Sequence, residues 1–333
     1  MIIVMSKRIS ELESLFDVYN RSLQVVWPDA TDTFLCPLCM SPFKKEDIYN
    51  GTLSIEHVPP KSIKTVIKTM TCTQCNNTIG TKLQRFMTND VRRKELEAGI
   101  ELKKPFRAKV RMLGFQFDTE ITSTSGRTWK AVSPLSILSS DLKSMEVAKK
   151  IAGAKASISL KGMGTKEVLD RAYLHSSYLA LFGLLGYPYI MQPFMEEIRQ
   201  YIINGQSSID ARITVPTELR HKIPFIDARE KNVEVSLMGT APDLEKSCFA
   251  LVIAGEFVLM PLISDYYQVI HSEFNSLLSD AATYLKNHSP FDISLLEIDP
   301  LCKYATHYVF EKGRRVGDWE MLKLSPVRGD EWS

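Results

Sequence analysis

Four of the six cysteines form two Cys-x-x-Cys pairs, and these residues carry the clearest chemical signal in the sequence. The pairs are Cys36 with Cys39 and Cys72 with Cys75. Each such turn lets two thiolates converge on one metal ion, and two turns supply the four sulfur ligands of a closed tetrahedral zinc site. Redox pairs or chance spacing are the alternatives, but two pairs in one short polar segment favour metal binding. We expect structural Zn²⁺, because a closed site leaves no open position for catalysis.

A carboxylate, an imidazole and a carboxamide stand close to the cysteine pairs. Glu56 and His57 follow the alternating run 52–55, which predicts a short strand. Asn76 directly follows Cys75, at the start of a predicted helix. Zinc would hold the start of this helix beside the strand, so we expect Glu56, His57 and Asn76 to lie within reach of one another. For His57 taken alone, a capping or zinc-site histidine is the alternative.

This combined pattern resembles the HNH endonucleases, also called His-Me finger or ββα-metal nucleases, and most of all their four-cysteine branch, which includes phage junction-resolving enzymes. The resemblance covers about sixty residues. It implies that Glu56 and Asn76 bind a catalytic divalent ion and that His57 is the general base. The sequence has Glu where Asp is also common, and it lacks the histidine of the family's third motif position. The other ligands of the ion therefore stay unassigned.

These residue types suit phosphodiester hydrolysis on chemical grounds as well. A neutral histidine can accept a proton near pH 7. Mg²⁺ is a hard ion that prefers oxygen ligands and keeps several waters, so one carboxylate and one amide oxygen are a reasonable protein contribution. The ion, Mg²⁺ or Mn²⁺, would act as a Lewis acid and a template.

Cationic residues are concentrated around this predicted site, although the net charge of the whole chain is only +2. Between residues 57 and 94 there are eight lysines and arginines and a single acidic residue. Such a patch attracts phosphate groups, so we expect nucleic-acid backbone to bind there. A solvated basic surface without a partner is the alternative. The predicted contact residues, the first three of them placed in a loop between the two motifs, are Lys61, Lys64, Lys68, Lys82, Arg85, Arg92 and Arg93.

The elements around these residues predict an α+β protein with two domains. The first, residues 1–98, is a small zinc-stabilised ββα-metal (HNH) module that begins with an amphipathic helix over 7–26. The second, residues 99–333, is a larger mixed α+β domain. Its predicted elements are a β-meander over 106–132, a strand over 156–160, a buried helix stopped by Gly186 and Pro188, a helix over 193–203, strands joined by a turn at Ala254-Gly255, a hairpin turn at 311–315, and helices over 142–152 and 266–287.

The larger domain shows no catalytic motif, so we expect it to control target choice, regulation or assembly. His175 on its buried helix is interpreted as a core histidine rather than a metal ligand. Any homo-oligomer or partner protein is expected to be contacted through this domain.

The totals describe an ordinary globular chain, with 44% hydrophobic and 24% charged residues. No apolar run approaches the length of a membrane span. The first residues lack a signal-peptide pattern, and Cys248 and Cys302 are unpaired, as expected in a reducing compartment. We therefore predict a cytoplasmic protein that does not associate with membranes.

The function predicted from these features is that of a metal-dependent endonuclease. The expected partner is DNA, although the residues do not separate DNA from RNA. The resemblance suits a role in bacterial restriction or anti-phage defence. The rival prediction is a catalytically inactive, zinc-stabilised DNA-binding module. A zinc scaffold for protein–protein contacts is a third possibility, but it leaves the basic patch unexplained.

Overall fold

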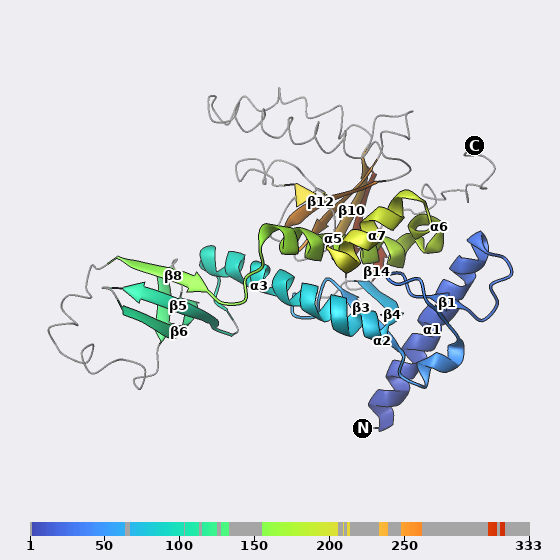
Figure 1. Cartoon of the computed structure of the whole chain (residues 1–333), viewed down its shortest axis with the longest axis horizontal. Coiled ribbons are helices and arrows are strands. Elements are labelled where there is room, and N and C mark those ends of the chain that lie inside the picture. Colours follow the sequence, from blue (N-terminus) through green and yellow to red (C-terminus); the bar gives the residue numbers. More distant parts are fainter. Residues whose placement is uncertain are drawn as a thin grey trace. The chain divides into compact units, whose positions relative to one another are not determined.

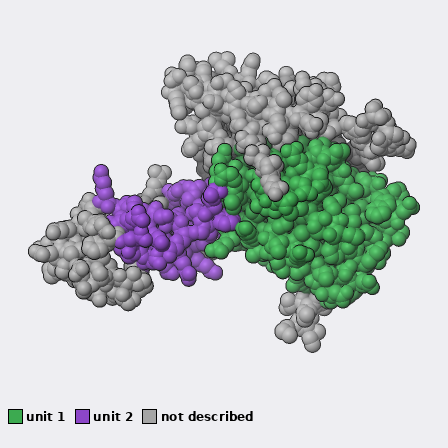
Figure 2. Space-filling view, in the orientation of Figure 1, with its two compact units in different colours: residues 1–85, 166–333 green, residues 86–165 purple. Residues whose placement is uncertain are grey.

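The computed structural model of the chain divides into two compact units (Figures 1 and 2). Unit 1 contains residues 1–85 and 166–333, and unit 2 contains residues 86–165. The boundary lies inside helix α3 (Thr81–Glu97), whereas the composition of the chain shifts near Gly99. The predicted domains, 1–98 and 99–333, stay a prediction. The structure describes residues 2–63, 67–102, 104–112, 115–124, 128–132, 155–205, 209, 212–213, 233–238, 248–261, 306–311 and 314–316.

A hairpin followed by a helix carries the predicted motif (Figure 1). Strand β3 (Leu53–Val58) pairs antiparallel with β4 (Ile67–Cys72). The chain then passes through α2 (Thr73–Cys75) and the π-helical turn η2 (Asn76–Gly80) directly into α3. The short strand and the helix start near Thr73 agree with the prediction.

The second strand of this hairpin differs from the prediction, which placed Lys68 in a loop. Lys68 lies in β4, opposite His57 of β3. The sequence of β4 lacks an apolar alternation, because its buried positions include Thr69 and Thr71. The Thr69 hydroxyl hydrogen-bonds the Tyr19 hydroxyl at 2.7 Å, which satisfies one of these buried polar groups.

Two short strands flank the turn that holds the first cysteine pair. Strand β1 (Phe34–Leu35) pairs antiparallel with β2 (Pro42–Phe43), and the 3₁₀-helix η1 (Lys45–Ile48) follows. The turn between the strands is closed by a hydrogen bond from the Met40 N–H to the Cys36 carbonyl, at 2.8 Å.

Helices surround the hairpin of unit 1 and form its core. Helix α1 (Ile2–Val26) buries Leu12, Phe16, Tyr19 and Leu23 at helical spacing, as its sequence predicts. The Tyr19 ring stacks on Phe182 with ring centroids 4.4 Å apart. Apolar burial of this kind is the main favourable contribution to folding.

Helix α5 (Lys166–Leu185) is buried all round from Ala172 to Phe182, because it packs against β4 on one side and β12 (Glu256–Pro261) on another. Gly186 ends the helix with φ of +70°. A β-carbon there would collide with the Ser22 hydroxyl, so the position requires glycine. The short helix α6 (Tyr187–Ile190) and helix α7 (Phe194–Asn204) follow.

A six-stranded antiparallel sheet completes the described part of unit 1. Its order is β14-β13-β10-β11-β12-β9. The predicted turn at Ala254-Gly255 joins β11 to β12, and both turn residues have positive φ. The predicted hairpin near the chain end is the pair β13 and β14. The remaining bounds are β9 Arg212–Ile213, β10 Val233–Met238, β11 Cys248–Ile253, β13 Thr306–Glu311 and β14 Arg314–Val316.

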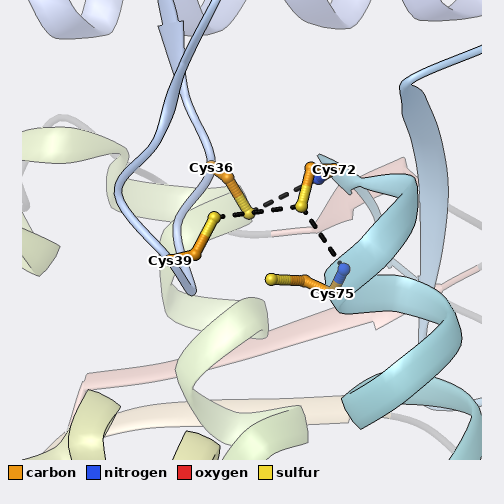
Figure 3. A group of neighbouring side chains, drawn as sticks. All are labelled: Cys36, Cys39, Cys72 and Cys75. Carbon is orange, nitrogen blue, oxygen red and sulfur yellow. Dashed lines mark hydrogen bonds between the residues drawn. The ribbon is translucent and has the colours of Figure 1, made fainter.

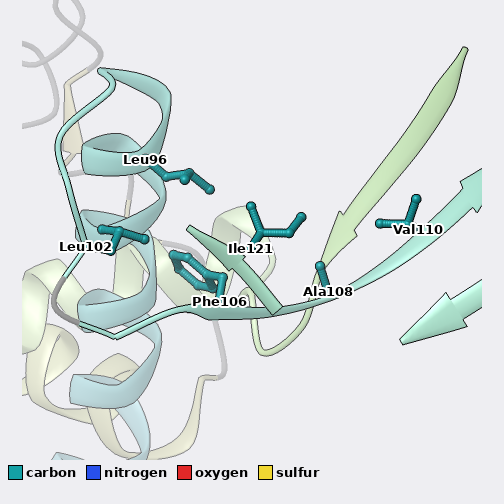
Figure 4. Close-up of a cluster of buried hydrophobic side chains, with 6 residues drawn as sticks. All are labelled: Leu96, Leu102, Phe106, Ala108, Val110 and Ile121. Carbon is teal, nitrogen blue, oxygen red and sulfur yellow. The ribbon is translucent and has the colours of Figure 1, made fainter. Parts of the chain in front are cut away.

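Unit 2 is built on a four-stranded antiparallel sheet of order β7-β6-β5-β8. The meander β5 (Phe106–Met112), β6 (Phe115–Thr124) and β7 (Thr128–Val132) agrees with the prediction, as does β8 (Ala156–Leu160). One face of the sheet joins the end of α3 in an apolar core (Figure 4). Its buried members are Leu96, Leu102, Phe106, Ala108, Val110 and Ile121.

The mixed α+β class predicted from the sequence is therefore confirmed. Lys64, Cys302 and the predicted helices 142–152 and 266–287 lie outside the described residues. In the part of the chain that the structure describes, no helix combines the length and the apolar character needed to cross a membrane.

Candidate functional site

The four predicted cysteines form one cluster in unit 1 (Figure 3). The Sγ atoms of Cys36, Cys39, Cys72 and Cys75 all lie within 4.8 Å of one another, and those of Cys39 and Cys72 are 3.9 Å apart. Tetrahedral zinc with Zn–S bonds of about 2.3 Å requires sulfur–sulfur distances of about 3.8 Å. The cluster therefore fits zinc with little rearrangement, as the sequence predicts.

Backbone N–H groups already point at two of these sulfurs. The Cys72 N–H donates to the Cys36 sulfur at 3.4 Å, and the Cys75 N–H donates to the Cys72 sulfur at 3.3 Å. Hydrogen bonds of this kind stabilise a thiolate, which is the form that binds metal. The Cys36 thiol hydrogen-bonds the Cys39 sulfur and lowers the pKa of Cys39 to about 6. The cluster thus favours at least partial ionisation before any cation enters.

Two tyrosines from the C-terminal half hold the first cysteine turn, and no pattern in the sequence indicates this role. The Tyr178 hydroxyl of α5 donates to the Pro37 carbonyl at 2.7 Å. The Tyr187 hydroxyl of α6 donates to the Leu35 carbonyl and accepts from the Leu35 N–H at 2.8 Å. The cysteine cluster and helices α5 and α6 therefore share one core.

Glu56 and Asn76 converge at a point beside Gly80. A β-carbon at residue 80 would lie 3.0 and 3.1 Å from the two carboxyl oxygens of Glu56, and 3.3 Å from Oδ1 of Asn76. The glycine leaves that space to the three oxygens. Asn76 begins the π-helical turn η2, and π turns inside helices often accompany functional sites.

The orientation of the Asn76 amide follows from its hydrogen bonds. Its Nδ2 atom donates to the Ser54 hydroxyl at 3.0 Å and to the Ile55 carbonyl at 3.3 Å. A carbonyl oxygen only accepts, so nitrogen must face Ile55 and Oδ1 must face the Glu56 carboxyl group. Two acceptor groups therefore lie side by side.

The Glu56 carboxyl group is 1% exposed and only partly satisfied. Gln84 of α3 donates from Nε2 to Oε1, while Oε2 has no hydrogen-bond partner among the described residues. Burial raises the pKa of Glu56 to about 8, against the lowering effect of the Gln84 bond. The site is therefore suited to a cation or a proton between Glu56 and Asn76.

Gln84 is a site residue that the sequence reasoning missed. Asn76, Gly80 and Gln84 follow one another at intervals of four, which places all three on one helix face. That spacing was the available signal.

No family model, curated protein or solved structure matches the chain. The mixed α+β fold and the four-cysteine cluster are properties of the structure itself. The resemblance to HNH endonucleases stays a prediction.

The His57 side chain does not share the space that Glu56 and Asn76 share beside Gly80. Successive side chains of a strand point to opposite faces, so the imidazole leaves β3 on the opposite face from the Glu56 carboxyl group. Partial burial, with repulsion from Lys61 and Lys68, lowers the pKa of His57 to about 4. The imidazole is therefore neutral at pH 7, as a general base must be.

The predicted basic residues divide into two groups. Lys68 pairs with Glu11, Arg93 pairs with Asp90 and Glu97, and Arg92 donates to backbone carbonyls and lies over the Phe106 ring. These side chains make contacts within the protein, and their predicted contact with nucleic acid stays a prediction. The second group is exposed to solvent and consists of Lys61, Lys82 and Arg85.

Proposed function

We propose that residues 36–84 form a zinc-stabilised, divalent-ion-dependent phosphodiesterase site of the HNH type, which acts on nucleic acid. The four-cysteine cluster supports the structural half of this proposal. Zinc there would join the start of α2 to the turn between β1 and β2 and so fix the helix that carries Asn76. Because the cluster has four sulfur ligands, it leaves no open position for a substrate.

The observation that carries the catalytic half is the Oε2 atom of Glu56, which has no hydrogen-bond partner among the described residues and lies beside Oδ1 of Asn76. A carboxylate and an amide oxygen are ligands that Mg²⁺ and Mn²⁺ accept, and these ions keep their other positions for water and phosphate. Gln84 holds the second carboxyl oxygen and orients the group. A bound ion would polarise a phosphate oxygen and stabilise the leaving oxygen.

His57 is the proposed base, because its neutral imidazole can take a proton from water at neutral pH. Among the described residues β3 pairs with β4 alone, so β3 has an edge that β4 does not cover. Substrate at this edge would lie between the face that carries His57 and the face that carries Glu56. Lys61, which repels a proton on His57, would also attract phosphate there.

The test is the cleavage of plasmid DNA by zinc-loaded full-length protein, with and without Mg²⁺. We expect cleavage only with the ion. His57→Ala should lower the rate by about 10²- to 10⁴-fold, as expected for the loss of a general base, while zinc content stays the same. Glu56→Gln should also abolish cleavage, and the exposed Glu46→Gln is its matched control. Cleavage by His57→Ala at the wild-type rate would contradict the assignment of the base.

A second candidate function is a nucleic-acid-binding module without catalysis. The observation in its favour is that the His57 imidazole and the Glu56 carboxyl group leave β3 on opposite faces. The same experiment separates the two functions. Ion-independent DNA binding without any cleavage in Mg²⁺ or Mn²⁺ would favour the binding module.

A further inference from the structure

The outer face of the unit 2 sheet carries cationic side chains that the proposed site does not use. Along β5 the buried residues alternate with Arg107, Lys109 and Arg111, which are exposed. The buried set belongs to the apolar core on the other face. The alternation therefore places three cations in one row on the solvent side, as the pleat of a strand requires.

Serine hydroxyl groups of β8 flank this row on one side, and on the other side β6 supplies one amide, Gln116, and two carboxylates, Asp118 and Glu120. Lys109 lies opposite Ser159 of β8, and Arg111 lies opposite Ser157 of β8 and Gln116 of β6. All three neighbours are exposed. A hollow of about 350 Å³ lies over this part of the sheet, lined by Lys109, Arg111, Gln116, Ser157, Ile158 and Ser159.

The charge of this face is positive even with its acidic residues included. Among the described residues, the outer face carries five cations, which are Arg107, Lys109, Arg111, Lys130 and Lys161, and two acids, Asp118 and Glu120. Asp118 is paired with Lys161 at 2.8 Å and lies opposite Lys109, and Glu120 lies opposite Arg107, so the positive charge of the face comes from its excess of cations over acids. Gln116 accepts from Nε of Arg111 at 2.6 Å and keeps the other nitrogens of that guanidinium available.

We propose that this face, the outer side of β5, β6 and β8, binds the sugar–phosphate backbone of nucleic acid. Alternate residues of a strand lie about 6.7 Å apart, so the three cations form a regular line rather than a single point charge. Lysine, arginine, serine and glutamine side chains are the groups that contact phosphate in protein–nucleic acid interfaces. A membrane surface would call for large apolar side chains beside the cations. The lined hollow contains only Ile158 of that kind.

This inference rests on the proposed function in one respect, since it names where the substrate backbone would lie. The sequence predicts that the backbone binds the basic stretch of residues 57–94. Several cations of that stretch form ion pairs with Glu11, Asp90 and Glu97, which favours the unit 2 sheet as a further binding surface. Unit 2 therefore supplies a cationic surface whose row on β5 includes Arg107 and Lys109. Binding does not need cleavage, so the two proposals can fail separately.

The test measures binding of a short fluorescein-labelled DNA duplex to zinc-loaded full-length protein by fluorescence anisotropy, over a range of KCl concentrations. The variant carries Arg107→Gln, Lys109→Gln and Arg111→Gln. We expect its affinity to fall by about ten- to hundredfold, and its salt dependence to weaken by about 0.9 in log–log slope for each phosphate that the variant no longer neutralises. The matched control, with three exposed cations outside this face replaced, carries Arg21→Gln, Lys104→Gln and Lys166→Gln.

Circular dichroism and zinc content confirm that both triple variants are folded. Equal affinity and equal salt slope for the two triple variants would overturn the proposal. Tighter binding of poly-glutamate than of DNA, abolished in the β5 variant, would also overturn it and indicate an acidic protein partner. The anisotropy is measured without added Mg²⁺ or Mn²⁺, so a failure of the proposed active site would leave the binding result unchanged.

Discussion

The carboxyl group of Glu56 and the amide oxygen of Asn76 share one space, and Gly80 keeps it open. All three oxygens lie within 3.3 Å of the position that a β-carbon at residue 80 would occupy. The Glu56 group is buried, and one of its oxygens has no hydrogen-bond partner in the described part of the chain. An unsatisfied buried carboxyl oxygen is costly unless a proton or a cation is present.

Gly80→Ala should therefore inactivate the protein without unfolding it. The new methyl group would occupy the space between Glu56 and Asn76, and divalent-ion binding and cleavage should fall by at least about tenfold. Alanine is favoured over glycine within a helix by about 1 kcal/mol, which offsets part of the cost of the close contacts with the Glu56 oxygens, so the protein should stay folded. The measurements are plasmid cleavage and urea denaturation.

The exposed neighbour Asn77 provides the matched control, because Asn77→Ala changes the same helical turn without entering the site. It should keep wild-type cleavage. If Gly80→Ala were fully active, the space between Glu56 and Asn76 would have no part in the reaction.

Removal of zinc should destabilise the two cysteine turns and also the helices that contact them. Cys72→Ser should lose the metal, and structural zinc contributes folding free energy directly. Because Tyr178 and Tyr187 hydrogen-bond the turn that carries Cys36, the destabilisation should spread into α5 and α6. Elemental analysis should find one zinc per chain, and hydrogen exchange should show faster exchange in both helices.

Cys248→Ser is the control for this variant, since Cys248 belongs to neither Cys-x-x-Cys pair of the sequence. It should retain zinc and wild-type exchange. Folded wild-type protein without zinc, or slow exchange in α5 of the Cys72→Ser variant, would contradict the assignment.

The stability of the protein should depend on the pH through Glu56. Its pKa is raised to about 8 in the folded state, above the ordinary value of 4.5. The unfolded chain binds fewer protons between these values, so the contribution of Glu56 to the free energy of unfolding is greatest below about pH 4.5 and falls as the pH rises to about 8. Glu56→Gln removes this dependence. At pH 9 the variant should melt higher than the wild type without Mg²⁺, and saturating Mg²⁺ should stabilise only the wild type.

A separate dependence on acid should come from His175. Its ring is 1% exposed, and neither nitrogen has a hydrogen-bond partner among the described residues. Burial lowers the pKa of His175 to about 4, so stability is lost as the pH falls from about 6.5 to about 4. His175→Phe should remove this acid sensitivity in thermal melts. Unchanged acid sensitivity in the variant would show that the His175 ring does not stay neutral in the folded core.

Sequence reasoning could predict the features that local patterns encode. The Cys-x-x-Cys spacing indicated the four-sulfur cluster, and alternation indicated β3 and the unit 2 meander. The turn at Ala254-Gly255 was indicated by its position between two apolar runs. Strand β4 was missed because its inward positions include Thr69 and Thr71, whose burial depends on a partner such as Tyr19 in α1. Tertiary contacts of this kind are invisible in a single sequence.

The same limit applies to the site. Glu56 and Asn76 could be named from their positions beside the cysteine pairs. Gly80 and Gln84 follow Asn76 at intervals of four, but their roles also depend on the π-helical turn that begins at Asn76 and on the contact with Glu56. The direction of the His57 imidazole also required the strand bounds, which place Glu56 and His57 inside β3.

The most direct test of the central claim is Mn²⁺ binding to zinc-loaded full-length protein, measured by isothermal titration calorimetry at pH 8. The account predicts one Mn²⁺ site per chain beyond the zinc, abolished in Glu56→Gln and weakened in Asn76→Ala. The exposed Glu46→Gln should bind Mn²⁺ like the wild type. Equal Mn²⁺ binding by Glu56→Gln and Glu46→Gln, or no binding by the wild type, would contradict a divalent-ion site at Glu56 and Asn76.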